Sequence, residues 1–590
     1  MGKAINNGIL GGHKRNFASF ARECAKNDIR RPGVWRTTRL PTFAKPVTSS
    51  FRRFSRRDSA ASMFQIDRRK LVASLALSGA STLAGRAEAQ QPAAPAPPPQ
   101  AAPNGTPGFG YESVLRRARE LASVPLTPPP ALPDPLAKLD ADAWRDIRFR
   151  SERSLLSNNN SLFRLQTYHL GANFRRPVTV NVIRDGIATP IPYAANLFDY
   201  GATKFEKPLP VNLGFAGFRL QFPLNDPRSV EEVISFLGAS AFRFLGRGQR
   251  YGVSSRGLVV NGGATPEETP FFREFWIETP EPGADRLTIY ALLDGEATTG
   301  AYRFDLTPGA ETTLEVNLTL FPRKAGVKLG LAPLGSMFFM GETDRGARAD
   351  YRPEVHDSDG LLIHTGAGEW LWRPLRNPAA PEISAFMDKN VRGFGLIQRD
   401  RAFEHYQDLD LAYELRPTCW IEPLGAWSEG HVELLESPAT DETAENIAAF
   451  WVPREAPEPG KPFALGYRIR STLDMARLSP GGRAVSAFQT EVKVSGGKEQ
   501  APPNARRFLI DFAGGDLPFF LTEPSSVAAT VTTTNGRILR SSLSPNPHVK
   551  GFRASFDVQL EPGEATDLRV FLRHGSRAIT ETWTRPFKAE

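Results

Sequence analysis

Cysteine is nearly absent from this chain of 590 residues, which contains only Cys24 and Cys419. A disulfide framework is therefore excluded, and stability must come from the size of the hydrophobic core. The chain is long enough for two or more domains with such a core. The apolar stretch 71–83 is too short to span a bilayer, so stable insertion in a membrane is not expected.

Several common catalytic motifs are also missing. The sequence has no HExxH, no P-loop and no G-x-S-x-G, and Gly246-Arg247-Gly248 lacks the third glycine of a dinucleotide site. Zinc proteolysis, nucleotide chemistry and α/β-hydrolase catalysis therefore lose their main support in the sequence. No cofactor is predicted.

The positive charge of the chain is confined to its beginning. The whole chain carries +9, whereas Lys and Arg outnumber Asp and Glu by 11 in residues 1–62 and by 2 in residues 63–89. Residues 90–590 therefore carry about four negative charges net. A nucleic-acid partner is not expected, because the basic arm is not part of the working protein.

Residues 63–89 have the order of an export signal. The basic group Arg68-Arg69-Lys70 precedes the apolar stretch, and Ala87-Glu88-Ala89 forms an A-x-A cleavage site. The paired arginines favour the twin-arginine route, with cleavage after Ala89 and a periplasmic location; the alternative is an ordinary signal with a basic flank. Residues 1–62 then read as disordered or as sequence upstream of the true start.

After this signal, the pattern predicts a tether and an all-β body. Residues 90–107 are rich in Pro and Ala and predict an extended tether. Helical spacing predicts a helix over 111–122, and a second short helix is expected within 135–148. From about residue 160 the apolar period becomes two, as in strands with one buried face.

Alternation and turn residues predict the architecture. Leu314, Val316, Leu318 and Leu320 alternate with polar neighbours, and the 50 Gly and 50 Pro punctuate short strands. This pattern favours β-sandwiches over a parallel α/β sheet. A polar, Gly-containing stretch within 473–500 predicts a boundary between a large sandwich, 108–472, and an immunoglobulin-like sandwich, 485–590.

Acidic residues gather in two segments. The first contains Glu354, His356, Asp357 and Asp359, and the second, DETAEN, contains Glu442 and Glu445. An acid and a base from distant loops are what glycoside hydrolysis needs. His356, Asp357 and Asp359 offer metal ligands too, but an Asx turn explains them equally, and no second cluster has metal-ligand spacing. No metal site is predicted.

Paired tryptophans suggest a sugar platform. Trp370 and Trp372 fall on one face of an expected strand, next to Arg373. Indole rings bind the apolar faces of sugars, and neighbouring Arg and acids can hydrogen-bond hydroxyls. The alternative is a tryptophan pair packed in the core of the sandwich.

Long segments of the large predicted domain resemble the osmoregulated periplasmic glucan biosynthesis proteins, the family of the G and D proteins. These segments include LGFAGFRLQFPLN (213–225), FREFWIE (272–278), KLGLAPLGSMFFMGE (328–342), YRPEVHDSDGL (351–361), GEWLWRPLRNP (368–378), GFGLIQRDRAFEHYQDLD (393–410) and ETAENIAAFWVP (442–453). The twin-arginine signal is more similar to that of the D protein.

The resemblance implies a sandwich like that of galactose mutarotases, joined to the immunoglobulin-like domain. It implies action on the β-1,2-linked glucan backbone, delivered by a membrane glucosyltransferase, as an anomer-inverting endo-β-1,2-glucanase or transglycosylase. The alternatives are a non-catalytic glucan-binding or assembly factor and, by analogy of fold alone, a sugar epimerase or mutarotase.

The resemblance also assigns roles to residues. It implies that Asp357 is the general base and Glu445 the general acid, with Glu442 as a substitute or helper. The family commonly has Asp where this chain has Glu445, so the carboxyl stands about one methylene further from the backbone. The substrate-binding residues that we predict are Trp370, Trp372, Arg373, His356, Asp359, Arg399 and Tyr406.

Overall fold

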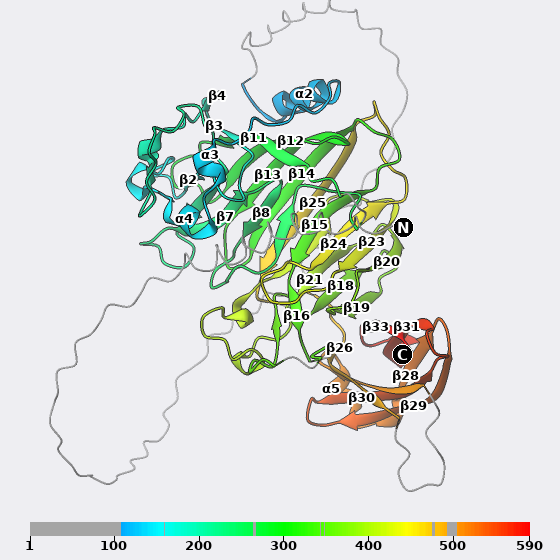
Figure 1. The fold of residues 1–590 in the computed structure, drawn as a ribbon. Helices are drawn as coiled ribbons and strands as arrows, with labels where there is room; N and C mark the ends of the chain where they lie inside the picture. The colour runs from blue at the N-terminus through cyan, green and yellow to red at the C-terminus, as the bar shows by residue number, and fades with distance from the viewer. Residues whose placement is uncertain are drawn as a thin grey trace, which may run out of the picture. The chain divides into compact units, whose positions relative to one another are not determined.

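The computed structural model describes residues 108–157, 160–263, 267–342, 344–346, 349–474, 478–492 and 504–589. The predicted start region, signal peptide and tether (1–62, 63–89 and 90–107) lie outside the described residues. Within the described ranges the chain is mostly β-sheet with a few short helices (Figure 1), which confirms the predicted all-β sandwich class. No helix in these ranges is both long and apolar enough to cross a membrane.

Among the described residues, one sheet has ten strands. In spatial order they are β2 (Arg164–Tyr168), β6 (Gly217–Phe222), β7 (Glu231–Leu237), β8 (Ala241–Phe244), β9 (Ser254–Arg256), β15 (Leu329–Ser336), β24 (Ile447–Pro453), β23 (Glu429–Glu436) and β20 (Glu382–Lys389), with β10 (Val259–Val260) paired to β15.

A second sheet has fifteen strands within the same described ranges. In order they are β28 (Val527–Thr533), β31 (Ala565–His574), β33 (Thr582–Lys588), β19 (Trp370–Pro374), β18 (Gly360–His364), β21 (Gly393–Ile397), β22 (Thr418–Pro423), β25 (Phe463–Thr472), β14 (Thr312–Pro322), β13 (Thr298–Thr307), β12 (Leu287–Asp294), β11 (Phe271–Glu278), β3 (Thr179–Arg184) and β4 (Ile187–Pro190), with β32 (Arg577–Ala578) paired to β31.

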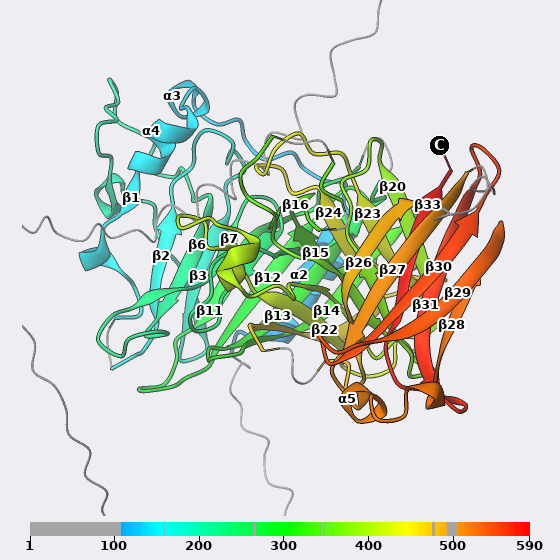
Figure 2. The ribbon, with the colours of Figure 1, turned by 90° about the horizontal axis from the view of Figure 1, so that it is seen from below.

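Smaller sheets complete the described part of the fold. A four-stranded sheet contains β26 (Arg483–Glu491), β27 (Ala505–Ala513), β30 (Gly551–Gln559) and β29 (Arg537–Asn546), which Figure 2 shows side by side. Two strand pairs, β1 (Arg148–Phe149) with β5 (Phe198–Asp199) and β16 (Phe338–Met340) with β17 (Val355–His356), lie outside the larger sheets.

The largest core fills the space between the ten-stranded sheet and strands of the fifteen-stranded sheet. Leu314, Val316, Leu318 and Leu320 of β14 are buried there, as their alternation predicts, together with Phe236 of β7. Successive side chains of a strand point to opposite faces, so an apolar residue at every second position supplies one continuous buried surface.

A second core lies under the four-stranded sheet. Phe508 and Phe556 of that sheet pack with Trp583 of β33 and Trp372 of β19. Strand β33 pairs in parallel with β19, with Trp372 opposite Trp583. The fifteen-stranded sheet therefore runs through both predicted domains, and the boundary between 472 and 485 stays a prediction.

Short helices accompany the sheets, and the first of them packs on β12, β13 and β14 of the fifteen-stranded sheet. They are α2 (Tyr111–Ala122), α3 (Asp134–Ala137), α4 (Ala141–Asp146) and α5 (Leu517–Phe520), with single 3₁₀ turns η1 (Ser151–Arg153), η2 (Ala195–Leu197), η3 (Phe403–His405), η4 (Tyr413–Leu415) and η5 (Pro524–Ser526). Helix α2 matches the predicted 111–122 and buries Val114 and Ala118 on one face. The helix expected within 135–148 is instead two helices, because the Asp140 side chain accepts a hydrogen bond from Ala143 N at 2.8 Å and starts α4.

One buried histidine stabilises the first part of the fold. The side chain of His169, only 2% exposed, lies among Tyr193, Phe198 and Tyr200. Its Nδ1 is 2.6 Å from the Leu170 carbonyl oxygen, and Nε2 is 2.9 Å from the Tyr193 hydroxyl. These two partners suit a neutral imidazole, in which Nδ1–H donates to the carbonyl and Nε2 accepts from the hydroxyl.

Protonation of His169 should destabilise the protein in mild acid. Burial lowers the pKa of His169 from 6.5 to about 4, although the bond to Leu170 opposes this. The pKa of His169 is lower in the folded state than in the unfolded state, so protonation favours unfolding. The free energy of unfolding is therefore unaffected by His169 above about pH 6.5 and decreases as the pH falls toward 4. By pH 5 the loss should be about 2 kcal/mol.

Urea denaturation at about pH 7.5 and at about pH 5 checks this prediction. These two pH values lie on either side of the pKa of the unfolded state. We expect His169→Gln to lose about 2 kcal/mol less than the wild type between these two pH values. His548 is exposed, so His548→Gln is the matched control and should behave like the wild type. An equal loss in the wild type and the His169 variant would contradict the assignment.

Candidate functional site

Asp357 follows strand β17 and opens the loop that leads to β18. Its backbone N–H donates to the Met337 carbonyl at 2.8 Å, which fixes the start of this loop. Its side chain is only 3% exposed, and its Oδ1 accepts a hydrogen bond from Arg416 Nη1 in an ion pair. The carboxylate is thus held inside the protein by a cation from the segment that precedes β22.

Glu445 lies just before β24, in the predicted acidic segment. Its Oε1 forms an ion pair with Arg243 of β8, and Ser254 Oγ of β9 donates to Oε2 at 3.0 Å. The Asn446 amide fixes the neighbouring backbone through bonds of 2.9 Å with Phe338 N, Phe338 O and Ser437 O. Strands from the ten-stranded sheet therefore hold Glu445 in place.

These two carboxylates belong to one electrostatic group. Burial raises the pKa of Asp357; the charges of Arg416 and Arg243 oppose this rise, and that of Glu445 adds to it. Arg243 thus acts on both acids, which are far apart in the sequence. The structure brings together the predicted acid and base, each about 3% exposed and each paired with an arginine.

Sequence reasoning missed both arginines. Arg243 stands between Phe242 and Phe244 in a strand in which every side chain is buried. A charged residue in a buried strand needs a partner of opposite charge. The position of Arg243 between two Phe residues could therefore have indicated an ion pair. Arg416 lies in an irregular segment and offers no such pattern.

Glu442 lies in a different ion cluster. Its Oε2 is 2.5 Å from Arg352 Nη2, and the same guanidinium contacts Asp350 at 2.8 Å and Asp408 at 3.0 Å. The Glu442 side chain is 24% exposed. Its predicted role as a helper in catalysis stays a prediction, because its contacts are to Arg352 and not to Asp357 or Glu445.

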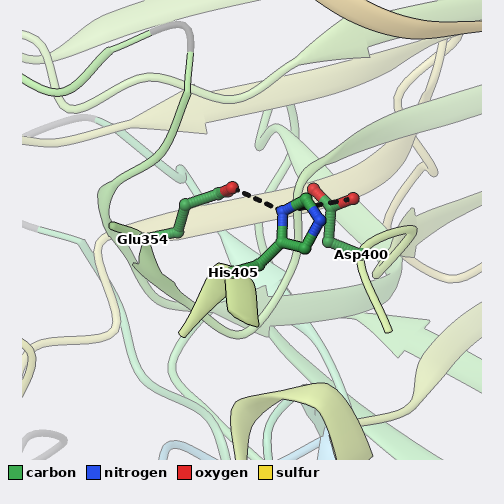
Figure 3. A group of neighbouring side chains, drawn as sticks. All are labelled: Glu354, Asp400 and His405. Atoms are coloured by element: carbon green, nitrogen blue, oxygen red, sulfur yellow. Dashed lines mark hydrogen bonds and ion pairs between the residues drawn. The ribbon is translucent and has the colours of Figure 1, made fainter. Parts of the chain in front are cut away.

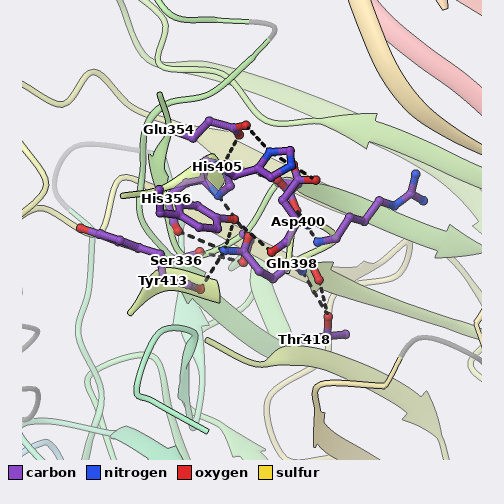
Figure 4. A network of polar contacts seen from close by, with 12 residues as sticks. Ser336, Glu354, His356, Gln398, Asp400, His405, Tyr413 and Thr418 are labelled. Atoms are coloured by element: carbon purple, nitrogen blue, oxygen red, sulfur yellow. Dashed lines mark hydrogen bonds and ion pairs between the residues drawn. The ribbon is translucent and has the colours of Figure 1, made fainter. Parts of the chain in front are cut away.

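A hydrogen-bonded network surrounds His356, next to Asp357 (Figure 4). His356 Nε2 is 2.8 Å from Glu354 Oε2 and 3.4 Å from Asp359 Oδ1, and Nδ1 is 3.1 Å from Gln398 Oε1. The Gln398 amide donates to the Tyr406 hydroxyl at 2.7 Å. The predicted residues His356, Asp359 and Tyr406 are therefore close together, with Glu354 of the predicted acidic segment and with Gln398, which was not predicted.

Opposing effects set the protonation of this network. Burial lowers the pKa of His356, but the charge of Asp359 and the bond to Glu354 outweigh it and raise that pKa to about 9. Burial, with the charges of Asp359 and Glu354, raises the pKa of Asp400 to about 8. At neutral pH, His356 is thus a buried cation between carboxylates.

Two groups of side chains in the described part of the chain have the spacing of metal ligands. One contains Glu354, Asp400 and His405 (Figure 3), and the other Glu354, His356 and Asp359. The second lies in the interior, where the side chains of His356 and Glu354 are 1% and 6% exposed. The first is open to solvent on one side, since His405 is 39% and Asp400 28% exposed.

The predicted sugar platform lies where the two cores meet. Trp370 and Trp372 fall on one face of β19, as expected, and contact the second core. Trp370 stacks on His364 with ring centroids 4.1 Å apart, and the Arg399 guanidinium lies 3.4 Å from the centroid of Trp372. Trp372 is 5% exposed, so its ring faces are covered by protein, and its role in sugar binding stays a prediction.

Arg373 and Arg399 form ion pairs inside the protein. Arg373 Nη2 contacts Glu436 Oε2 at 2.7 Å, and both side chains are buried. Arg399 forms two bonds of 2.8 Å with Glu581 and donates to the Ala484 carbonyl at 2.7 Å, so it connects β21 to the C-terminal part of the chain. Their predicted contacts with substrate stay predictions as well.

Comparison with known proteins gives consistent matches over most of the chain. The family model described as "Periplasmic glucan biosynthesis protein, MdoG" matches residues 109–587. The chain is 44% identical to the probable glucans biosynthesis protein D of Shewanella oneidensis over 77% of this chain and 83% of that protein. It is 41% identical to the glucans biosynthesis protein G of Ralstonia nicotianae over 81% of this chain and 95% of that protein.

Proposed function

Since this chain belongs to the MdoG family of periplasmic glucan biosynthesis proteins, we propose that it acts on the β-1,2-linked glucan backbone as an anomer-inverting endo-β-1,2-glucanase or transglycosylase. The observation that supports this activity is the electrostatic group of Asp357 and Glu445, two carboxylates from distant segments that share the field of Arg243. Inverting glycoside hydrolysis needs an acid and a base of this kind.

The proposed roles follow from the chemistry of inversion. Asp357 takes a proton from the attacking water or sugar hydroxyl, and Glu445 gives a proton to the oxygen that leaves the anomeric carbon. The raised pKa of Asp357 brings its carboxyl closer to the pH at which a base works well. Because both side chains are buried, these protons pass through intervening hydroxyls or water, and Ser254, which contacts Glu445, is one such hydroxyl.

The proposal includes a route to the periplasm and a partner. The export signal 63–89, with its twin arginines and cleavage after Ala89, would deliver the protein to that compartment. There a membrane glucosyltransferase would supply the linear glucan.

Incubation of the purified protein with linear β-1,2-glucan tests the proposed activity. We expect shorter, relinked or cyclic products by size analysis, and NMR of the first products should show the inverted anomer. Absence of any change in the glucan at several pH values would rule out the enzyme.

A non-catalytic glucan-binding or assembly factor is the second candidate. It is favoured by the burial of Asp357 and Glu445, each of which is already neutralised by an arginine. Such a protein would hold the nascent glucan beside the glucosyltransferase without changing its bonds. The two functions differ in what they require of Asp357.

A further inference from the structure

We propose that Glu354, Asp400 and His405 form a binding site for a divalent transition metal ion such as Zn²⁺ or Mn²⁺. The side chains come from two segments: Glu354 lies before β17, while Asp400 and His405 follow β21, with His405 in the 3₁₀ turn η3. Figure 3 shows them pointing toward one another. The site lies beside the loop of Asp357 and is independent of the proposed reaction.

The geometry suits a metal ion. His405 Nδ1 lies 2.9 Å from Glu354 Oε1 and 3.7 Å from Asp400 Oδ1, and one ligand atom from each residue lies within 4.8 Å of the others. In a tetrahedral zinc site with bonds of about 2.0–2.1 Å, neighbouring ligand atoms are about 3.4 Å apart. Small side-chain shifts are therefore enough to bring all three atoms onto one ion.

The donor set determines the class of ion. An imidazole nitrogen favours transition metals, and carboxylate oxygens are accepted by Zn²⁺ and Mn²⁺ alike. The partial exposure of Asp400 and His405 gives the ion a path from solvent. It also leaves room for water in the remaining coordination positions.

The charges around the site favour a dication. Four carboxylates interact here, from Glu342, Glu354, Asp359 and Asp400. Two nearby cations oppose them, His356, which contacts Asp359 and Glu354, and Arg401, which interacts with Asp359 and Asp400. Arg399, although adjacent, is neutralised by Glu581. A divalent ion bound by Glu354 and Asp400 would offset the charge of these ligands.

A second layer of hydrogen bonds already orients the ligands. Glu354 Oε2, the oxygen that points away from His405, accepts from His356 at 2.8 Å, and Gln398 holds His356 from its other side at 3.1 Å. The Tyr406 hydroxyl donates to the Asp400 carbonyl at 3.2 Å. Metal ligands are usually fixed by outer bonds of this kind. The cluster of Arg352 with Asp350, Asp408 and Glu442 contains no imidazole.

The ion would connect two segments near the proposed reaction centre. Glu354 is three residues before Asp357, while Asp400 and His405 lie in the segment that follows β21. Without the ion, side-chain bonds of His405 with Glu354, of His356 with Gln398 and of Arg352 with Asp408 link these segments. Metal binding would therefore raise the stability of the folded protein, because the ion binds the native arrangement and not the unfolded chain.

The experiment uses the purified full chain, stripped with EDTA and titrated separately with ZnCl₂ and MnCl₂ by calorimetry. We expect one ion per chain and a rise of a few degrees in the melting temperature on adding the metal. Asp400→Asn and His405→Ala should each weaken binding by about 100-fold or more, since loss of outer-shell groups alone costs 10–100-fold. Both side chains are partly exposed, so these variants should fold.

The matched control is His431→Ala. His431 Nε2 also lies beside a carboxylate, Glu433, at 3.3 Å, but it belongs to neither group with metal-ligand spacing. This variant should bind the metal like the wild type. The proposal is overturned if the wild type binds neither metal stoichiometrically, or if both ligand variants bind as tightly as the wild type.

Discussion

Replacement of Asp357 by asparagine should lower the rate of β-1,2-glucan cleavage or transfer by about 10²–10⁴-fold, the usual contribution of a general base. The amide has the shape of the carboxylate but cannot accept the proton of the attacking hydroxyl. Binding of the glucan should be unchanged, because Asp357 is buried and contacts Arg416 rather than solvent. Product sizing and calorimetric binding with the same glucan measure both quantities.

The control for this variant must lose a comparable ion pair elsewhere. Asp557 accepts two bonds from Arg507, at 2.7 and 2.8 Å, and its side chain is 7% exposed. Asp557→Asn should therefore keep full activity, and it should lose less stability than Asp357→Asn because Arg507 is 28% exposed. If Asp357→Asn retains the wild-type rate, or leaves glucan production in cells intact, the assembly-factor function is favoured instead.

Replacement of Arg243 by methionine should destabilise the protein by about 3–5 kcal/mol, the range for removing one partner of a buried ion pair. The variant keeps a side chain of similar length but leaves Glu445 without its cation in a site that is 3% exposed. It also removes one of the positive charges that oppose the rise in the pKa of Asp357, so that pKa should rise further. Urea denaturation at neutral pH measures the stability.

A double variant separates charge from packing. If the unpaired Glu445 carboxylate causes the loss, Arg243→Met with Glu445→Met should recover most of it, since replacing both members of a buried pair is often neutral. Arg507→Met, which breaks a partly exposed pair, should cost only about 1 kcal/mol. A double variant as unstable as Arg243→Met would show that packing, and not the unpaired charge, sets the cost.

The sequence predicted individual strands and helices well, because the spacing of apolar residues within one element determines which of its faces is buried. Alternation in 314–320 predicts the buried face of β14, and helical spacing predicts α2 at its observed bounds. The break between α3 and α4 was missed, although Asp140 is a residue type that commonly caps helices. The continuous sheet across both cores was also missed, since nothing local in β19 indicates pairing with residues more than 200 positions later.

The candidate site could be predicted only in part. The two acids were assigned from the resemblance to the glucan biosynthesis proteins, since the residues alone select no pair, and the structure places both in one electrostatic group. Their arginine partners and the ligands Glu354, Asp400 and His405 come from segments that meet only in three dimensions. For Trp370 and Trp372, the alternation of side chains along a strand correctly predicted a shared face. It could not predict that the second core covers that face.

The parallel pairing of β33 with β19 has a consequence for biosynthesis. Residues 582–588 complete a sheet whose neighbouring strand is synthesised more than 200 residues earlier. Until then β19 is an open edge that carries two tryptophans, a template for unwanted strand pairing. The native sheet therefore closes only after β33 has been synthesised, and a nascent chain would need protection at the β19 edge until then.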